Sequence, residues 1–218
     1  MSALLPRFGV LVPVKPPAVA KSRLAALGDD VRRALASAFA ADTVSAVLAC
    51  DRVERVLTVT DDHELAAELA ALGSEVLPDA VADDLNATLE QAAAELLRRR
   101  PGLRLAAVCA DLPALRPEEL DAALAVAPAD RMCFLADEER RGTTLVAAPG
   151  IATFRPRFGH GSRVEHLLTA AELDLDAVPT LRRDVDTPED LREAVELGVG
   201  RHTRGALACS HAGHGLRL

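Results

Sequence analysis

Aromatic residues are scarce in this chain of 218 residues, which contains no tryptophan, no tyrosine and only five phenylalanines. Its core must therefore be built mainly from Ala, Leu and Val. Stacking platforms for single-stranded nucleic acid need several aromatic side chains and are hard to assemble here. The formal net charge of −8 also argues against a broad nucleic-acid or anionic-membrane surface. An anionic ligand would have to be bound at a local basic site.

The cysteine pattern and the hydropathy also exclude several classes of protein. The four cysteines form no Cys-x-x-Cys pair: they are Cys50, Cys109, Cys133 and Cys209. Scattered thiols, together with the lack of an export signal in the first residues, favour a reducing cytoplasm. No apolar run reaches the roughly 18 residues of a membrane-spanning helix. We expect a cytoplasmic protein without a membrane partner.

Strand and helix patterns alternate along the chain. The expected strands span 8–14, 53–60, 76–77, 103–110, 132–136, 143–148 and 180–185, and the expected helices span 30–49, 62–72, 84–97, 117–126, 162–173 and 187–198. Such alternation is typical of an α/β fold with three layers and a mostly parallel sheet. We expect a single domain over residues 1–200. Residues 201–218 lack apolar periodicity and are expected to form a flexible tail.

Lysine is almost as scarce as the aromatics, because Lys15 and Lys21 are the only lysines among 25 basic side chains. Both follow the first expected strand, where prolines interrupt the chain. Ligands of open α/β sheets bind at this carboxyl edge. Genomic bias could have left two lysines here by chance. The alternative is that compact ammonium groups bind phosphate oxygens at this edge, with Arg23 nearby.

Three aspartates stand at the ends of expected strands. Asp111 follows the apolar central strand and could hold Mg2+, although it could equally cap a turn. Asp184 and Asp186 alternate along the last expected strand and would point to the same side, although Asp186 could simply cap the next helix. Together with the lysine segment, these carboxylates describe a metal-assisted phosphoryl or nucleotidyl transfer site. An oxidoreductase is disfavoured because no Gly-x-Gly-x-x-Gly follows the first strand.

Five motifs occur in a fixed order. They are Lys-Pro-Pro-x-x-Ala-Lys-Ser-Arg-Leu (15–24), Asp-Leu-Asn-Ala-Thr-Leu (84–89), Ala-Asp-Leu-Pro (110–113), Arg-Phe-Gly-x-x-Ser (157–162) and Asp-Val-Asp-Thr-Pro-Glu-Asp-Leu (184–191). The ordered set resembles the phospholactate/phosphoenolpyruvate guanylyltransferase family of deazaflavin-coenzyme biosynthesis. That family resembles the wider nucleotidyltransferase fold of glycosyltransferase-A type. One departure is that Pro-Val-Lys-Pro-Pro replaces the glycine-rich phosphate loop of many proteins with that fold.

The resemblance implies an enzyme that joins the GMP part of GTP to the phosphate of a three-carbon acid and releases pyrophosphate. Lys15, Lys21 and Arg23 would contact the triphosphate. Asp111 and Asp186 would hold the Mg2+ cofactor, with Asp184 as a helper. The guanine preference has no residue-level explanation in the sequence.

The resemblance also implies roles on both sides of the reaction. Asn86 would face the base or ribose, unless it only forms a hydrogen bond at a helix start. Thr143, Gly159 and Ser162 would bind the acceptor, although Gly159 fits an ordinary turn and Ser162 an ordinary helix cap. By family analogy and an Arg- and Ala-rich composition, phosphoenolpyruvate is preferred over 2-phospholactate or phosphoglycerate.

Other interpretations stay open at this point. The chain could be a nucleotidyltransferase for a sugar phosphate or a pterin, or a nucleotide-binding protein without catalysis. His160 fits a solvated loop, and Cys209, His211 and His214 lack a fourth metal ligand. The oligomeric state is undecided, with a homodimer as one option.

Overall fold

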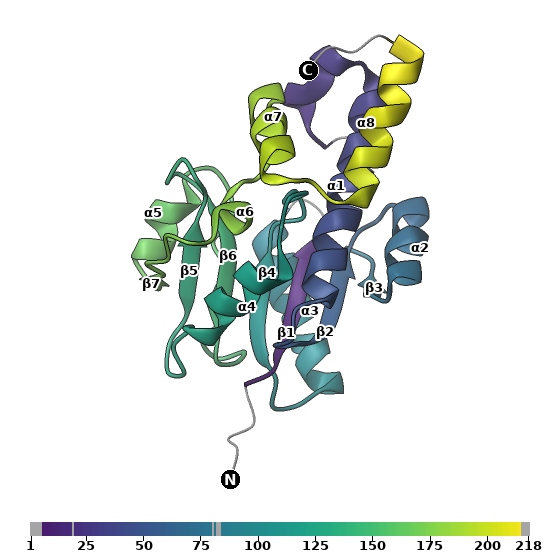
Figure 1. Cartoon of the computed structure of the whole chain (residues 1–218). Helices are drawn as coiled ribbons and strands as arrows, with labels where there is room; N and C mark the ends of the chain where they lie inside the picture. The colour runs from purple at the N-terminus through teal and green to yellow at the C-terminus, as the bar shows by residue number, and fades with distance from the viewer. Residues whose placement is uncertain (1–5, 19, 80, 82–83, 215–218) are drawn as a thin grey trace.

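The computed structural model in Figure 1 describes residues 6–18, 20–79, 81 and 84–214. Its strands form one sheet in the order β3-β2-β1-β4-β6-β5-β7. The strands are β1 (Phe8–Pro13), β2 (Val53–Val59), β3 (Glu75–Leu77), β4 (Arg104–Val108), β5 (Cys133–Ala136), β6 (Thr143–Ala148) and β7 (Ala171–Glu172). Strand β6 runs antiparallel to β4 and β5, and the other pairings are parallel. The predicted mostly parallel α/β sheet is confirmed.

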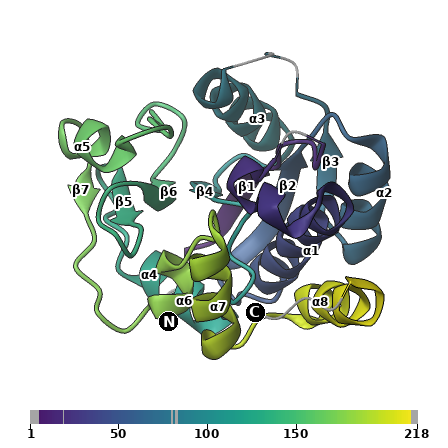
Figure 2. The same cartoon turned by 90° about the horizontal axis from the view of Figure 1, so that it is seen from above.

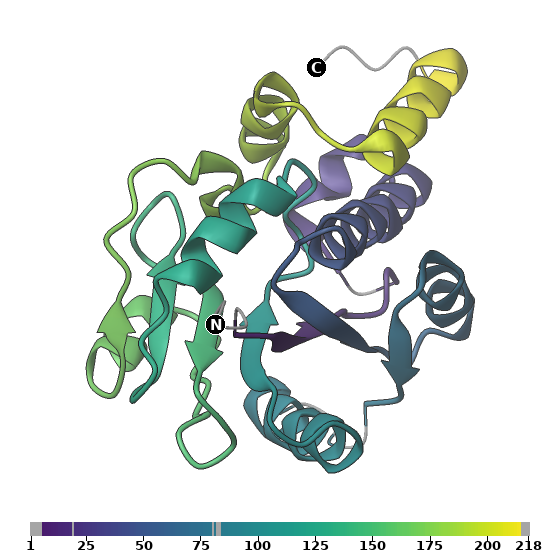
Figure 3. The ribbon, with the colours of Figure 1, turned by 60° about the horizontal axis from the view of Figure 1, so that its bottom comes forward.

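Helices cover both faces of this sheet, as Figure 3 shows. They are α1 (Asp29–Leu48), α2 (His63–Leu72), α3 (Leu85–Arg99), α4 (Pro117–Ala125), α5 (Ser162–Leu167), α6 (Pro179–Arg182), α7 (Pro188–Leu197) and α8 (Arg201–His214), with a 3-10 turn at Ser22–Leu27. Helix α3 lies on one face, and α1, α2 and α4 lie on the other. None of the described helices is long and apolar enough to cross a membrane.

The alternation of side chains along β1 explains the two packed faces. Val10 and Val12 are fully buried in the cluster that includes α1 and α2, whereas Leu11 is buried in the cluster with α3. A side chain on Gly9 would meet Leu96 of α3 at 2.4 Å, so α3 packs directly on the backbone of β1. Burial on both faces places β1 in the centre of the sheet and fixes where its carboxyl end lies.

The prediction of a last strand over 180–185 is wrong. Residues 179–182 form the short helix α6, because Pro179 suits a first helical turn and the buried Glu119 carboxylate accepts the N–H groups of Thr180 (2.8 Å) and Leu181 (3.2 Å). The following residues run extended toward the end of β4, where the N–H of Val185 donates to the Asp111 carbonyl at 3.0 Å. The aspartates after α6 therefore reach the sheet edge without being part of a strand.

Two further expectations near the C-terminus need correction. The helix expected over 162–173 ends at Leu167, and its N-cap is Gly161 in a left-handed conformation rather than Ser162. Residues 201–214 form helix α8, which packs along α1 as Figure 2 shows, so the expected flexible tail is wrong over this range. Residues 215–218 lie outside the described residues.

A buried carboxylate on α1 explains why α8 forms despite its weak apolar pattern. Asp42 is 6% exposed and accepts the N–H groups of His202 (3.0 Å) and Thr203 (2.8 Å) at the start of α8. A carboxylate at a helix N-terminus accepts hydrogen bonds from the free backbone amides of the first turn. Its negative charge is also attracted to the positive end of the helix dipole. Gly200 allows this approach, since a Cβ there would lie 2.3 Å from Asp42.

Replacing this cap should loosen α8. We expect Asp42→Ala to lower the free energy of unfolding by about 1–2 kcal/mol and to raise amide hydrogen exchange in α8. Asp42→Asn keeps an acceptor oxygen and should lose less. Asp130→Ala, at an exposed position, is the matched control; equal losses in Asp42→Ala and Asp130→Ala would contradict the assigned role.

Candidate functional site

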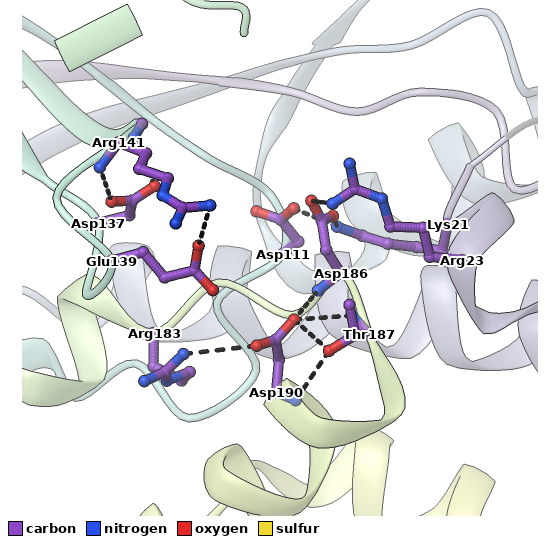
Figure 4. Close-up of polar contacts among 11 residues, drawn as sticks. Lys21, Arg23, Asp111, Asp137, Glu139, Arg141, Arg183, Asp186, Thr187 and Asp190 are labelled. Atoms are coloured by element: carbon purple, nitrogen blue, oxygen red, sulfur yellow. Dashed lines mark hydrogen bonds and ion pairs between the residues drawn. The ribbon is translucent and has the colours of Figure 1, made fainter. Parts of the chain in front are cut away.

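Three segments that are far apart in the sequence meet at the carboxyl edge of β1 and β4. The ammonium group of Lys21 donates to Oδ2 of Asp111 and, at 2.7 Å, to Oδ1 of Asp186. Arg23 lies 3.6 Å from the other oxygen of Asp186. Figure 4 shows the two carboxylates turned toward these basic side chains. The structure thus brings together four of the residues that the sequence singled out.

The lysine segment is fixed from α1 by a buried arginine. Arg32 is 5% exposed, and its guanidinium donates to the carbonyl oxygens of Pro17 (2.9 Å), Ala18 (3.1 Å) and Ala20. Prolines lack the backbone N–H that would take part in regular backbone hydrogen bonding. The carbonyl oxygens of this loop therefore accept hydrogen bonds from a side chain instead. Lys21 itself adopts a left-handed conformation with φ 56°, which turns the chain sharply at the site.

Asp111 and Asp186 are also held through their backbones. The buried Thr43 hydroxyl on α1 donates to the carbonyl of Ala110 (3.1 Å) and accepts the N–H of Leu112 (3.0 Å), on either side of Asp111. Asp190 accepts the N–H of Asp186 at 3.1 Å and forms a capping box with Thr187. Thr187 is therefore the helix cap, and the Asp186 side chain is left to face Lys21 (Figure 4).

The charges in this cluster shift one another's ionisation. Burial alone would lower the pKa of Lys21, but the negative charges of Asp111 and Asp186 outweigh it and raise the pKa above its ordinary value. Burial would raise the pKa of Asp186, and Lys21 reverses this and lowers it. Asp184 makes no such pair: burial, then the charges of Asp111 and Asp186, raise its pKa to about 7. The site therefore carries more negative charge than its buried cation balances.

The arrangement of oxygens fits a divalent cation. Within the described part of the chain, no three His, Cys, Asp or Glu side chains are grouped so that they could hold a metal ion, and Lys21 bridges Asp111 and Asp186. However, Oδ1 of Asp111 is buried without a hydrogen-bond partner. A buried acceptor oxygen without a partner is costly, and hard cations such as Mg2+ prefer carboxylate oxygens. The residues present thus suit the expected cofactor.

A cavity of about 830 Å³ opens in front of this cluster. Its wall includes the basic side chains of Lys15, Lys21 and Arg23 together with the carboxylates of Asp111 and Asp186. Lys15 is exposed and lies near enough to lower the pKa of Asp186. The cavity continues past the ends of β2 and β3 to the start of α3, where Asp84, Leu85 and Thr88 line it. Its size suits a nucleotide.

The expected acceptor residues Thr143, Gly159 and Ser162 are not among the residues that line this cavity, although Phe158, which does line it, directly precedes Gly159. Thr143 begins β6 and is 5% exposed, with its hydroxyl 2.9 Å from Nδ1 of His166. Ser162 is 2% exposed, and its N–H donates to the carbonyl of Gly159 at 3.2 Å. Gly159 has φ 140°, a positive backbone angle that residues with a Cβ rarely adopt, so this position favours glycine. A Cβ on Gly142, which precedes Thr143, would lie 3.9 Å from Oγ of Ser162, so the Ser162 side chain lies close to the start of β6.

That Asn86 faces the base or ribose stays a prediction, and in the structure its side-chain amide contacts the backbone of Phe158. Its amide Nδ2 donates to the carbonyl of Phe158 at 3.0 Å, and its Oδ1 accepts the N–H of Phe158 at 2.8 Å. Asn86 thus holds the 157–159 loop against α3. Asp84, rather than Asn86, caps the helix.

His166 is the residue of this region that the sequence analysis missed. It is fully buried, whereas His160 is exposed as expected for a loop residue. A usable signal was present, because His166 follows the motif residue Ser162 by four positions and so shares its helix face. Cys209 is exposed, and the side chains of His211 and His214 lie outside the described residues.

Comparison with known proteins identifies the family. The family model described as "Guanylyl transferase CofC like" matches residues 8–209. The chain belongs to this family. It is 50% identical over 208 residues to a phosphoenolpyruvate guanylyltransferase of Streptomyces scabiei, covering 93% of this chain and 96% of that protein. A protein of the same name from Thermomonospora curvata is 48% identical over 203 residues, covering 92% and 89%.

A solved structure confirms the nucleotidyltransferase fold. A nucleotidyl transferase from Methanothermobacter thermautotrophicus superposes with a TM-score of 0.60 at 17% identity, covering 88% of this chain and 97% of that one. At this identity the likeness establishes the fold alone. The resemblance that the ordered motifs indicated is likewise confirmed by the family match.

The burial of His166 predicts a pH-dependent stability. Burial lowers its pKa from 6.5 to about 4, so between these values the unfolded chain binds a proton that the folded chain does not. The free energy of unfolding should therefore fall as the pH drops from about 6.5 to 4, by about 3 kcal/mol from this group at 1.4 kcal/mol per pKa unit.

Chemical denaturation across this range, with His166→Gln as reference, isolates the effect from the carboxylates that both proteins share. The stability difference between the two should shrink toward low pH. Parallel curves would show that His166 does not titrate in this way.

Proposed function

We propose that this chain transfers GMP from GTP to the phosphate of phosphoenolpyruvate and releases pyrophosphate. Membership of the guanylyl transferase family and 48–50% identity to relatives named for this reaction support the substrates. One structural observation carries the proposal. Lys21 joins Asp111 and Asp186 at the wall of a cavity of about 830 Å³, which puts cationic and carboxylate groups where a nucleotide triphosphate would lie.

The reaction needs positioning and charge stabilisation more than proton transfer. An oxygen of the acceptor phosphate attacks the α-phosphorus of GTP, and the bond from that phosphorus to the bridging oxygen of pyrophosphate breaks. A phosphate oxygen is already anionic near neutral pH, so no general base has to remove a proton. Lys15 and Arg23 would bind the triphosphate, and Lys21 would stabilise the charge that grows on the leaving pyrophosphate.

The carboxylates would hold the divalent cation. Asp111 offers a buried oxygen without a partner, Asp186 faces the same ammonium group, and Asp184 is electrostatically close to both. Mg2+ bound there would neutralise phosphate oxygens in the transition state. Asp111 and Asp186 would hold this cation, and Lys21 beside them would contact the triphosphate.

The acceptor would bind at Thr143, Gly159 and Ser162. A small anion with a carboxylate and a phosphate needs hydroxyl and amide donors in a confined space, and these residues offer both beside Phe158. Gly159 lets the backbone approach closely. Cysteines 50, 109, 133 and 209 are free thiols, which supports the cytoplasmic location that we propose.

An acceptor screen tests the proposal directly. Pyrophosphate release from GTP should require Mg2+ and phosphoenolpyruvate, 2-phospholactate or phosphoglycerate, with phosphoenolpyruvate giving the highest kcat/KM. Mass spectrometry should find a product in which GMP is joined to the acid. Release with a sugar phosphate or pterin instead would favour another nucleotidyltransferase, and GTP binding without release under any acceptor would favour a protein without catalysis.

Removing one charge at the centre should reduce turnover while the fold is kept. We expect Asp111→Asn to lower kcat/KM by about 10²–10³-fold, as loss of a group that stabilises transition-state charge does. The control is Asp121→Asn, which removes a carboxylate paired with Arg52 at 3.3 Å away from the cavity. Near wild-type turnover in Asp111→Asn, with an unchanged unfolding transition, would remove Asp111 from the mechanism.

A further inference from the structure

His166 lies in a closed pocket between the sheet and the 157–159 loop. It has no exposed surface. Its ring stacks on Phe134 of β5, with centroids 5.3 Å apart and planes at 26°, and meets the edge of Phe158 at 5.6 Å and 80°. Its two ring nitrogens are therefore fixed in direction: one faces the Thr143 hydroxyl and the other the Arg157 N–H, and the ring also forms a hydrogen bond with the backbone of Ser162.

The partners determine which nitrogen carries the proton. The backbone N–H of Arg157 points at Nε2 over 2.9 Å. An amide N–H can only donate, so Nε2 must be the unprotonated nitrogen. A neutral imidazole has one proton, which then sits on Nδ1 and is donated to Oγ1 of Thr143 at 2.9 Å. The reverse assignment would leave the ring with no proton on either nitrogen.

This tautomer fixes the role of the Thr143 hydroxyl. Because Oγ1 accepts from His166, the hydroxyl hydrogen is directed away from the imidazole and is available to another acceptor. The neighbouring Ser162 and Gly159 make the region next to Thr143 the expected acceptor pocket. An anionic oxygen in this region would meet the Thr143 hydroxyl as a hydrogen-bond donor, because the hydroxyl oxygen already accepts from His166.

We infer that His166 is a positioning residue that makes Thr143 a hydrogen-bond donor toward the phosphorylated acid and fixes the loop of Arg157 and Gly159. The inference rests on the proposed function, because it assigns Thr143 to the acceptor. Asn86 holds the same loop from the opposite side through Phe158. The acceptor pocket is thus held by one neutral imidazole and one amide, neither of which adds charge to it.

The tautomer can be read without any turnover. Long-range ¹H–¹⁵N NMR spectra of the full chain, labelled at histidine, should show a protonated Nδ1 and an unprotonated Nε2 for His166 at pH 7. His166→Gln identifies the signal. A protonated Nε2, or a ring protonated on both nitrogens, would overturn the inference even if the enzyme transfers GMP to the acid.

Matched variants then test the link to Thr143. His166→Gln places an acceptor near the position of Nε2 but loses the Nδ1 donor, whereas His166→Asn keeps a donor near Nδ1. We expect His166→Gln to raise KM for the acid about tenfold, the factor of one ordinary hydrogen bond, with KM for GTP nearly unchanged. His166→Asn should raise KM for the acid less.

The double variant separates positioning from general damage. In a Thr143→Val background, His166→Gln should change KM for the acid little, because the hydroxyl that it orients is gone. The inference would be overturned if the increases in KM for the acid caused by the two single substitutions multiplied in the double variant. It would also be overturned if His166→Gln raised KM for GTP as much as KM for the acid. If the proposed function itself is wrong, the failure appears earlier, as wild-type protein that turns over none of the three acids while His166 still shows the Nδ1–H tautomer.

Discussion

The contact of Lys21 with Asp111 and Asp186 is the interaction on which the site depends. It joins positions 90 and 165 residues apart, and each comes from a separate loop at the edge of the sheet. The pairing is largely shielded, with the Lys21 side chain 11% exposed. A buried ammonium group without its partners would be strongly disfavoured, so the cluster constrains the three loops to meet. The charges do not fully balance, since among the residues that the structure describes Asp184 forms no ion pair and Oδ1 of Asp111 has no hydrogen-bond partner.

The supporting contacts show how an irregular edge is made rigid. Arg32 and Thr43 both project from α1, one to the lysine loop and one to the loop of Asp111. Asp42, between them in sequence, fixes the start of α8. A single long helix therefore holds two parts of the site and the C-terminal helix through buried polar side chains. Their role is to satisfy backbone groups that loops leave unpaired.

The regular elements could be predicted from local sequence because their signals are local. Asp62 and Gly73 bound α2, Pro117 begins α4, and β6 spans 143–148 as expected. The predictions are wrong where a residue distant in sequence determines the local secondary structure. Glu119 turns 179–182 into a helix, and Asp42 caps a segment whose glycine and alanine content hides its periodicity. Asn86 was assigned correctly to a helix start, but its partner Phe158 lies 72 residues away.

The two halves of the site solve opposite electrostatic problems. On the proposed nucleotide side, lysines would bind the polyanionic triphosphate, and the carboxylates would hold a divalent cation. On the acceptor side, the attacking phosphate must keep enough charge to be nucleophilic, and a buried imidazolium would reduce that charge. Burial between Phe134 and Phe158 keeps His166 neutral, so in the proposed acceptor site Thr143 would orient the acid through its hydroxyl. In the proposed mechanism the attacking oxygen would stay electron-rich while cationic groups stabilise the leaving pyrophosphate.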